Sequence, residues 1–141
     1  MKMEDVKRKR CTCDFCGKRN WSPGHMRKHE LHCTMNPDRE CRVCKMVEGE
    51  QKPIAELMAV LPPTPTRADD EYGYSMIVGL TEEQVNATIP ALRAVCGACP
   101  ACMMAALRQR GIPVPMATVY SFKADMASLW SDIYESRRDQ Y

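Results

Sequence analysis

The chain has 141 residues, of which 45% are hydrophobic, only 6% are aromatic and nine are cysteine. A chain of this length forms one modest domain or two very small ones, and such domains bury too little surface to be stable without additional cross-links. No stretch approaches the roughly 20 consecutive apolar residues of a membrane-spanning helix, so we expect no contact with a membrane.

The nine cysteines are the expected cross-links, as disulfides in an oxidising compartment or as metal ligands in a reducing one. The first ten residues, MKMEDVKRKR, carry charges but no apolar segment of a secretory signal. We therefore expect an intracellular, reducing location and cysteines that bind metal, with disulfides as the alternative.

Residues 1–10 form a basic arm and precede a predicted zinc finger at 11–36. Positive charge is concentrated in this part of the chain although the net charge is only +2: residues 1–33 hold nine Lys or Arg and four Asp or Glu, and the other 108 residues hold 11 and 14. The remainder, 37–141, is predicted to be a helical domain.

A first metal site is predicted from Cys13-x2-Cys16, a spacer of twelve residues, and His29-x3-Cys33. A tight turn presents two thiolates on one side, and a helix presents positions i and i+4 on one face, so four donors converge on one zinc ion. His32 and Cys11 are expected to be spare, with Cys11 able to replace Cys13 if the turn shifts.

This segment, with Gly17 and Lys18 after the second cysteine, resembles the CCHC variant of the ββα zinc finger. The family's core aromatic position falls at Asn20, with Trp21 one place late, so irregular strands are expected, and Met26 takes the family's core leucine position. The resemblance places the DNA-facing helix positions at Ser22, His25 and Lys28.

One finger buries little surface, so contact with phosphates is easier to support than reading of a base sequence. The candidate nucleic-acid-binding residues are six basic side chains and one histidine of the arm and the finger: Arg8, Lys9, Arg10, Arg19, His25, Arg27 and Lys28. A solvated face, or a match to an acidic protein surface, is the alternative.

A second metal site is predicted from Cys41-x2-Cys44 with two of the three later cysteines. We favour Cys99 and Cys102, because a helix starting at Pro100 directs its positive N-terminal dipole at both thiolates, and Cys96 competes as a ligand. The arrangement resembles a treble clef site. Two zinc ions are therefore expected in the whole chain, with an iron–sulfur cluster at residues 96–102 as the alternative for the second site.

Between the two halves of this second site, the sequence predicts a helix at 53–61 and a Pro-rich acidic linker at about 62–75. Thr81 and Gln84 form a possible capping box for the next helix, which Pro90 should break or kink. A further helix begins at Pro100 and ends at Gly111.

The last predicted helix carries an apolar stripe that includes Phe122, Met126, Trp130, Ile133 and Tyr134. Such a stripe packs on the protein's own core or docks on another subunit. The expected fold is thus a small zinc-stabilised α+β protein, mostly helical, with an N-terminal ββα-like finger and a helical region stapled by a second zinc site.

No catalytic motif is expected to act in this chain. Both sites have four protein ligands, whereas a catalytic zinc keeps one position open, and HELHC at 29–33 lacks the His-Glu-x-x-His spacing of metalloproteases.

We expect a non-enzymatic structural or adaptor protein of a larger macromolecular assembly, of which a virion is one example. Its partners are then other proteins rather than a small-molecule substrate. The alternative is a small nucleic-acid-binding or regulatory zinc-finger protein that uses the basic N-terminal third.

Overall fold

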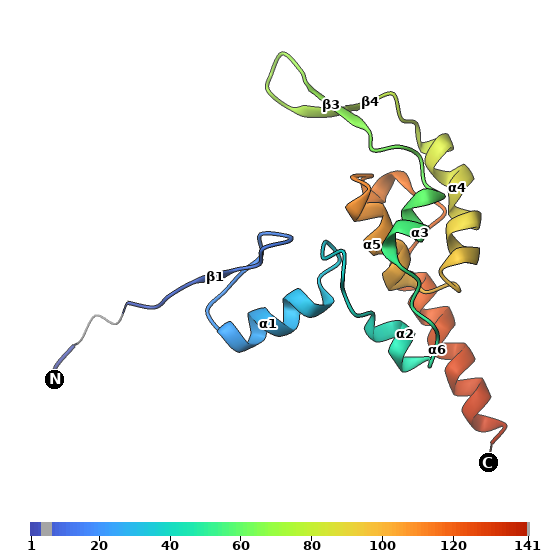
Figure 1. The fold of residues 1–141 in the computed structure, drawn as a ribbon, viewed down its shortest axis with the longest axis horizontal. Coiled ribbons are helices and arrows are strands. Elements are labelled where there is room, and N and C mark those ends of the chain that lie inside the picture. The colour runs from blue at the N-terminus through green and yellow to red at the C-terminus, as the bar shows by residue number, and fades with distance from the viewer. Residues whose placement is uncertain (4–6, 141) are drawn as a thin grey trace.

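The structure, a computed structural model, describes residues 1–3 and 7–140. It is mostly helical, with two small antiparallel sheets. An N-terminal segment of two short strands and a helix lies beside a larger group of helices, and a hairpin projects from that group (Figure 1).

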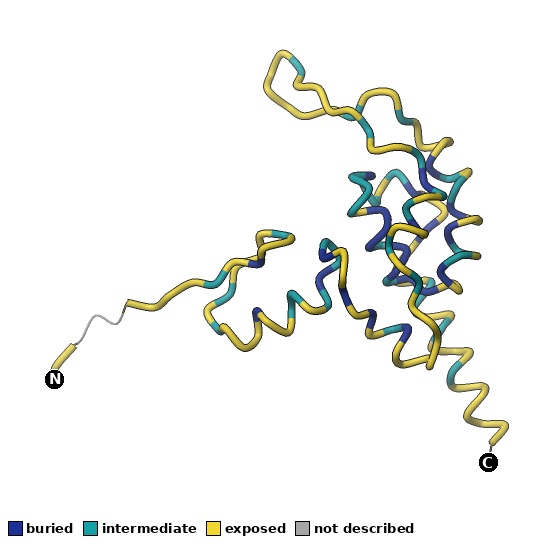
Figure 2. Tube along the Cα trace, in the orientation of Figure 1, coloured by how far each residue is buried: buried dark blue, intermediate teal, exposed yellow. Residues whose placement is uncertain are grey.

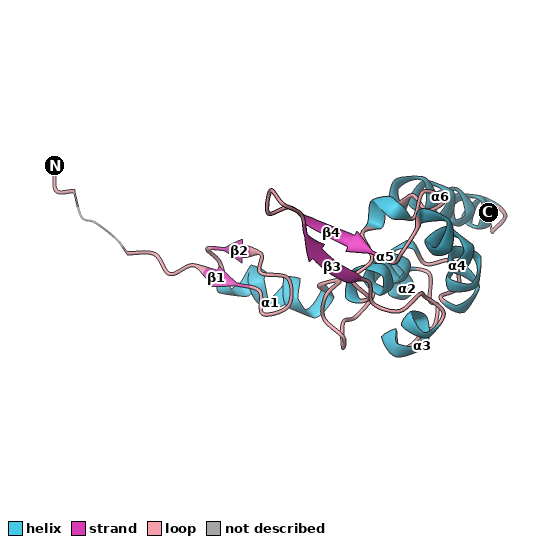
Figure 3. Ribbon diagram, turned by 90° about the horizontal axis from the view of Figure 1, so that it is seen from above, coloured by secondary structure: helices cyan, strands magenta, loops and turns pink. Residues whose placement is uncertain are grey.

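The N-terminal segment contains strands β1 (Cys11–Thr12) and β2 (Arg19–Asn20) and helix α1 (Pro23–His32). The strands pair in antiparallel register over two residues only. Helix α1 begins where Ser22 Oγ accepts a hydrogen bond from the amide of His25 and Pro23 occupies the first turn. Seen from above, both strands lie alongside α1 (Figure 3).

The helical group surrounds helix α5, which contributes more fully buried side chains than any other helix in the described part of the chain. Its elements are α2 (Arg42–Met46), α3 (Ile54–Ala59), α4 (Glu82–Val95), α5 (Pro100–Gln109), the 3-10 helix η1 (Val114–Met116) and α6 (Phe122–Arg138). The core contains Leu57, Val85, Ile89, Leu92, Met103, Leu107 and Ile112. Figure 2 shows these buried positions gathered where α3, α4 and α5 meet.

The helix boundaries predicted from the sequence agree in part with those in the structure. The capping box is present, with Thr81 Oγ1 accepting from the Gln84 amide and the Gln84 side chain accepting from the Thr81 amide. Gly111, at φ +78°, follows the end of α5 as a left-handed residue. Of the break or kink expected at Pro90, the break is not found: α4 continues to Val95, and the neighbouring Ile89 is fully buried in the core.

The stretch predicted as an extended linker is largely a hairpin, a correction to the sequence analysis. Strands β3 (Thr66–Asp69) and β4 (Ser75–Val78) pair in antiparallel register. Asp70 organises the turn, since its Oδ1 accepts from the amides of Tyr72 and Tyr74, and Gly73 adopts φ +82°. The hairpin projects away from the helices and is mostly exposed (Figures 1 and 2).

Helix α6 begins at Phe122 and is capped by Ser121, whose Oγ accepts from the Ala124 amide. It packs on α5 near its start, yet none of its residues is buried, and its C-terminal half extends beyond the other helices (Figure 1). The predicted apolar stripe is therefore only partly covered. Among the described residues, no helix is both long enough and apolar enough to cross a membrane.

Candidate metal centres

The first candidate centre joins the turn between β1 and β2 to helix α1. Cys13 and Cys16 come from the turn, and His29 and Cys33 come from the last turn and the end of α1. Cys13 Sγ lies 3.9 Å from Cys33 Sγ, and Cys16 Sγ lies 3.2 Å from His29 Nε2. All four donor atoms lie within 4.8 Å of one another.

Backbone hydrogen bonds hold the turn in the shape that presents both sulfurs. The Cys13 amide donates to the Lys18 carbonyl over 2.7 Å, and the Gly17 amide donates to the Cys13 carbonyl over 3.0 Å. Gly17 has φ +74°, a conformation that favours glycine. Glu30 of α1 ties the turn to the helix, because its Oε1 accepts from the Asp14 amide over 3.1 Å.

The second candidate centre joins two segments that are 58 residues apart in sequence. Cys41 caps α2 and Cys44 lies in it, while Cys99 precedes α5 and Cys102 lies in its first turn. The Sγ atoms of Cys41 and Cys99 are 3.5 Å apart, as are those of Cys44 and Cys102. All four cysteines are buried, and their donor atoms lie within 4.8 Å of one another.

Both groups fit a zinc ion. Sulfur ligands at about 2.3 Å from a tetrahedral zinc lie about 3.8 Å from one another, close to the sulfur–sulfur distances in each group. Cysteine sulfur and histidine nitrogen are also the ligands that zinc prefers. The predicted requirement for two zinc ions is thus confirmed to the extent that two CCHC and CCCC donor groups are within ligand distance.

A buried cation next to the second centre supports this fit. Arg39 is only 7% exposed, its Nη1 donates to Cys102 Sγ over 3.7 Å, and its buried Nε has no hydrogen-bond partner in the part of the chain that the structure describes. A buried charge is costly unless an opposite charge compensates it. Four thiolates around one zinc ion carry a net negative charge, so the occupied site supplies that compensation.

The pKa values of the thiols in this cluster are shifted in opposite directions. Side-chain hydrogen bonds from Cys102 and Cys99 hold the pKa of Cys41 well below its usual range, whereas burial raises the pKa of Cys44 to about 12. The pKa of Cys99 is raised because its thiol hydrogen-bonds to its neighbours Cys102 and Cys41. A buried group of thiols thus ionises in part only, and a divalent cation supplies the charge that lets the other protons leave.

The three spare candidates lie outside both donor groups. Cys96 is buried, and its Sγ donates weakly to the carbonyls of Arg93 and Cys99 at 3.7 Å. Cys11 is half-buried in β1, opposite Asn20. His32 Nδ1 donates to the Glu40 carbonyl over 2.9 Å. The structure therefore brings together Cys41, Cys44, Cys99 and Cys102 without Cys96.

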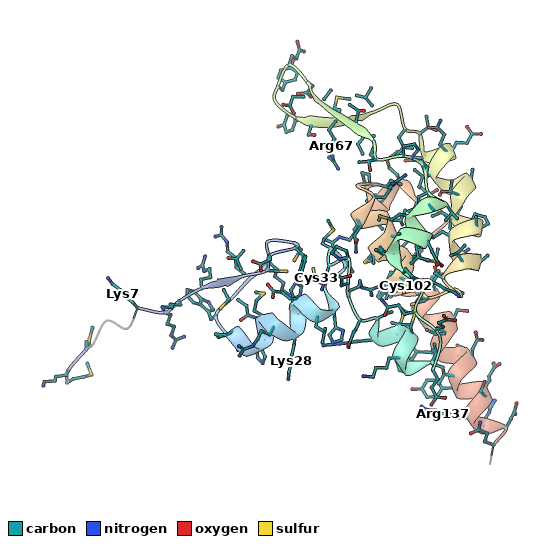
Figure 4. The ribbon with its side chains drawn as sticks, viewed as in Figure 1. Lys7, Lys28, Cys33, Arg67, Cys102 and Arg137 are labelled. Carbon is teal, nitrogen blue, oxygen red and sulfur yellow. The ribbon has the colours of Figure 1, made fainter. Side chains whose placement is uncertain are left out.

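The seven candidate nucleic-acid-binding residues are exposed, namely Arg8, Lys9, Arg10, Arg19, His25, Arg27 and Lys28. Figure 4 shows Lys28 pointing outward from α1 and Lys7 on the extended arm. Of the candidate docking residues, Phe122, Trp130 and Tyr134 are exposed, and Met126 and Ile133 are half-buried.

Sequence reasoning missed the polar contacts that support the second centre. Gln51 Oε1 accepts from the Cys41 amide over 2.6 Å, while its Nε2 donates to the Arg39 carbonyl over 2.7 Å. Neither Gln51 nor Arg39 belongs to a ligand pattern, and the only local signal is that Arg39 lies two residues before Cys41. These contacts fix the direction in which the chain enters α2.

No protein-family model, no curated protein sequence and no solved structure matches this chain.

Proposed function

We propose that this chain is a non-enzymatic zinc-binding adaptor of a larger macromolecular assembly, with two structural zinc ions. Each donor group supplies four protein ligands, which fills the coordination of a tetrahedral zinc, whereas a catalytic zinc keeps a position for water or substrate. We further infer that residues 13–33 are a CCHC variant of the ββα finger. The second centre is then treble-clef-like, built from a turn before α2 and the start of α5.

The observation that carries this proposal is the way in which the two centres are joined. Only residues 34–40 separate Cys33 from Cys41, and α5 holds this connection through side-chain hydrogen bonds. Gln109 Nε2 donates to the carbonyls of Thr34 and Asn36 over 2.8 and 3.0 Å. Arg108 Nη1 donates to Thr34 Oγ1 over 2.8 Å. These contacts favour a scaffold that presents the finger and the helical group in a fixed arrangement.

Helix α6 supplies the surface that we assign to a protein partner. Trp130 and Tyr134 are 40% and 65% exposed, and their ring centroids are 6.1 Å apart. Paired exposed aromatic side chains are typical of the centres of protein interfaces. Because α6 has no buried residue, the exposed aromatic side chains Phe122, Trp130 and Tyr134 are available to another subunit.

The test is co-sedimentation from cells that naturally make the protein. The tagged wild-type chain should sediment with a particle much larger than 16.0 kDa, and Trp130→Asp should remain near the top of the gradient. Both should retain two zinc ions per chain. Val119→Asp is the matched control, because Val119 is exposed and apolar but lies outside α6. Wild-type protein that sediments as a free chain contradicts the proposal.

Nucleic-acid binding through the finger is a second candidate function. Among residues 1–3 and 7–140, none of the six exposed Lys and Arg side chains in this set forms an ion pair, so their charge is free to meet phosphates. Neutralising Arg8, Lys9, Arg10 and Lys28 together should weaken binding to duplex DNA and flatten its dependence on salt. An unchanged salt slope contradicts this function.

A further inference from the structure

The tryptophan of the finger faces solvent rather than the finger's interior. Trp21 is 53% exposed, while the buried side chains of this segment are Cys13, Met26 and Cys33. At the position before it, Asn20 uses its Oδ1 to accept a hydrogen bond from the Ser22 amide over 3.0 Å. The polar side chain of Asn20 thus lies next to the core of this segment, and the indole of the following residue, Trp21, points to solvent.

Trp21 is held by structure on both sides. Asn20 pairs with Cys11 in the two-stranded sheet, and Ser22 caps α1. The indole therefore lies at the junction of the two-stranded sheet and α1. The first metal centre links these two elements to each other. An aromatic ring fixed in this way loses little conformational freedom when a flat ligand stacks on it.

One cation lies against this indole, and a second is close to it in sequence. The guanidinium carbon of Arg10 lies 4.7 Å from the centroid of the Trp21 ring, in a cation–π contact. Arg10 precedes the Cys11–Asn20 pair and Trp21 follows it, so both leave the same end of the sheet. Arg19 lies two residues before Trp21 and is exposed. The patch combines a flat apolar ring with positive charge that no carboxylate in the described residues neutralises.

We propose that Trp21, with Arg10 and Arg19, is a stacking platform for an unpaired base of a single-stranded nucleic acid. An indole stacks on the face of any base, here the ring face that Arg10 leaves uncovered, and the guanidinium groups of Arg10 and Arg19 neutralise the adjoining phosphates. A duplex hides the base faces in its own stack, so the platform favours single strands. This inference rests on the second candidate function, nucleic-acid binding by the finger, and names its substrate class.

The first test measures the fluorescence of Trp21 itself. The chain has two tryptophans, so Trp130→Phe leaves Trp21 as the only one. The zinc-loaded full-length variant is titrated with single-stranded DNA, single-stranded RNA and duplex DNA of the same sequence, each about 12 nucleotides long. We expect saturable quenching of Trp21 fluorescence by at least one single strand, and weaker binding of the duplex. The two single-stranded arms tell DNA from RNA.

Affinity is then compared among variants by fluorescence anisotropy with labelled single strands. Trp21→Ala should weaken binding about tenfold, the effect expected for loss of one stacked base, and Trp21→Phe should restore most of it. Trp130→Ala is the matched control and should bind as the wild type does. Zinc content and circular dichroism check that each variant is folded, so that loss of binding reports the platform itself.

Two results overturn the proposal in different ways. Equal binding of single strands and duplex without change in Trp21 fluorescence leaves a phosphate-binding finger but excludes the platform. Failure of all three nucleic acids to bind at low salt excludes both the platform and the nucleic-acid function, and the exposed indole then belongs to a protein interface.

Discussion

Arg39 Nη1 donates a hydrogen bond to the sulfur of Cys102 over 3.7 Å, although the two residues are 63 positions apart. Arg39 is buried, and its Nε has no partner in the described residues. A buried guanidinium needs a neighbouring negative charge, which the thiolates of the second centre supply. Arg39 links the segment between α1 and α2 to the ligands on α5.

Replacing Arg39 should weaken the second centre. Arg39→Leu removes the positive charge that compensates the metal-bound thiolates, and loss of such a supporting contact typically lowers metal affinity about 10-fold to 100-fold. The measurement is competition for zinc with a chromophoric chelator. Arg42→Leu is the control, since Arg42 is exposed on α2. Equal zinc affinity of Arg39→Leu and wild type contradicts the assigned role.

The ligands of the second centre can be separated from their buried neighbour by paired substitutions. Cys99→Ser should reduce the zinc content from two ions to one, because Cys99 Sγ lies 3.5 Å from Cys41 Sγ within the donor group. Cys96→Ser should retain both ions, since Cys96 hydrogen-bonds to backbone carbonyls instead. Native mass spectrometry counts the bound ions. Loss of an ion from Cys96→Ser with none lost from Cys99→Ser reverses the assignment.

Much of the metal chemistry is predictable from sequence, because zinc-ligand spacing is a local pattern. Cys13, Cys16, His29 and Cys33 are close in the chain, and each pair needs only a turn or a helix to aim its donors. The Cys99–Cys102 pair is predictable from the helix that Pro100 starts. Arg39 is not, since its contact with Cys102 depends on how two distant segments pack.

The fold is less predictable where few contacts fix it. Prolines and acidic residues in 62–75 suggest a linker, yet Asp70 and Gly73 supply the turn of a hairpin, a signal that was present in the sequence. The stripe of α6 is a second example, because the sequence left open whether it packs on the protein's own core or docks on another subunit. An apolar period indicates which side chains share a helix face, but it does not indicate whether the domain offers a core to cover them.

Zinc binding should release protons, so zinc affinity should rise with pH. In the metal-free chain, burial raises the pKa of Cys33 to about 11 and that of Cys44 to about 12, and both thiols are protonated at neutral pH. Zinc binds thiolates and must displace these protons. Calorimetry at pH 7 in two buffers of different ionisation enthalpy counts them. Cys96→Ser should release the same number, and zero release contradicts the prediction.

The direction of the stability change follows from the same pKa values. Without metal, the folded chain favours protonated Cys33 and Cys44, so their contribution is present below the ordinary thiol pKa of 9.0. It is lost as pH rises through about 11 and 12. With zinc bound the dependence reverses, because acid returns protons to the ligands. Thermal unfolding without zinc should show stability that falls as pH rises from 9.0 toward 12, whereas with zinc the stability should fall as pH drops below 9.0.

Substitution on α6 should cost far less stability than substitution in the core. Leu107 is fully buried on α5, and Leu107→Ala should lower the free energy of unfolding by about 2–5 kcal/mol. Trp130 is 40% exposed, so Trp130→Ala should lower it by less than about 1 kcal/mol, despite the larger side chain removed. Urea unfolding of the zinc-loaded chain measures both. A loss at Trp130 equal to that at Leu107 would make the stripe part of the protein's own core, whereas a small loss leaves its aromatic side chains for a partner.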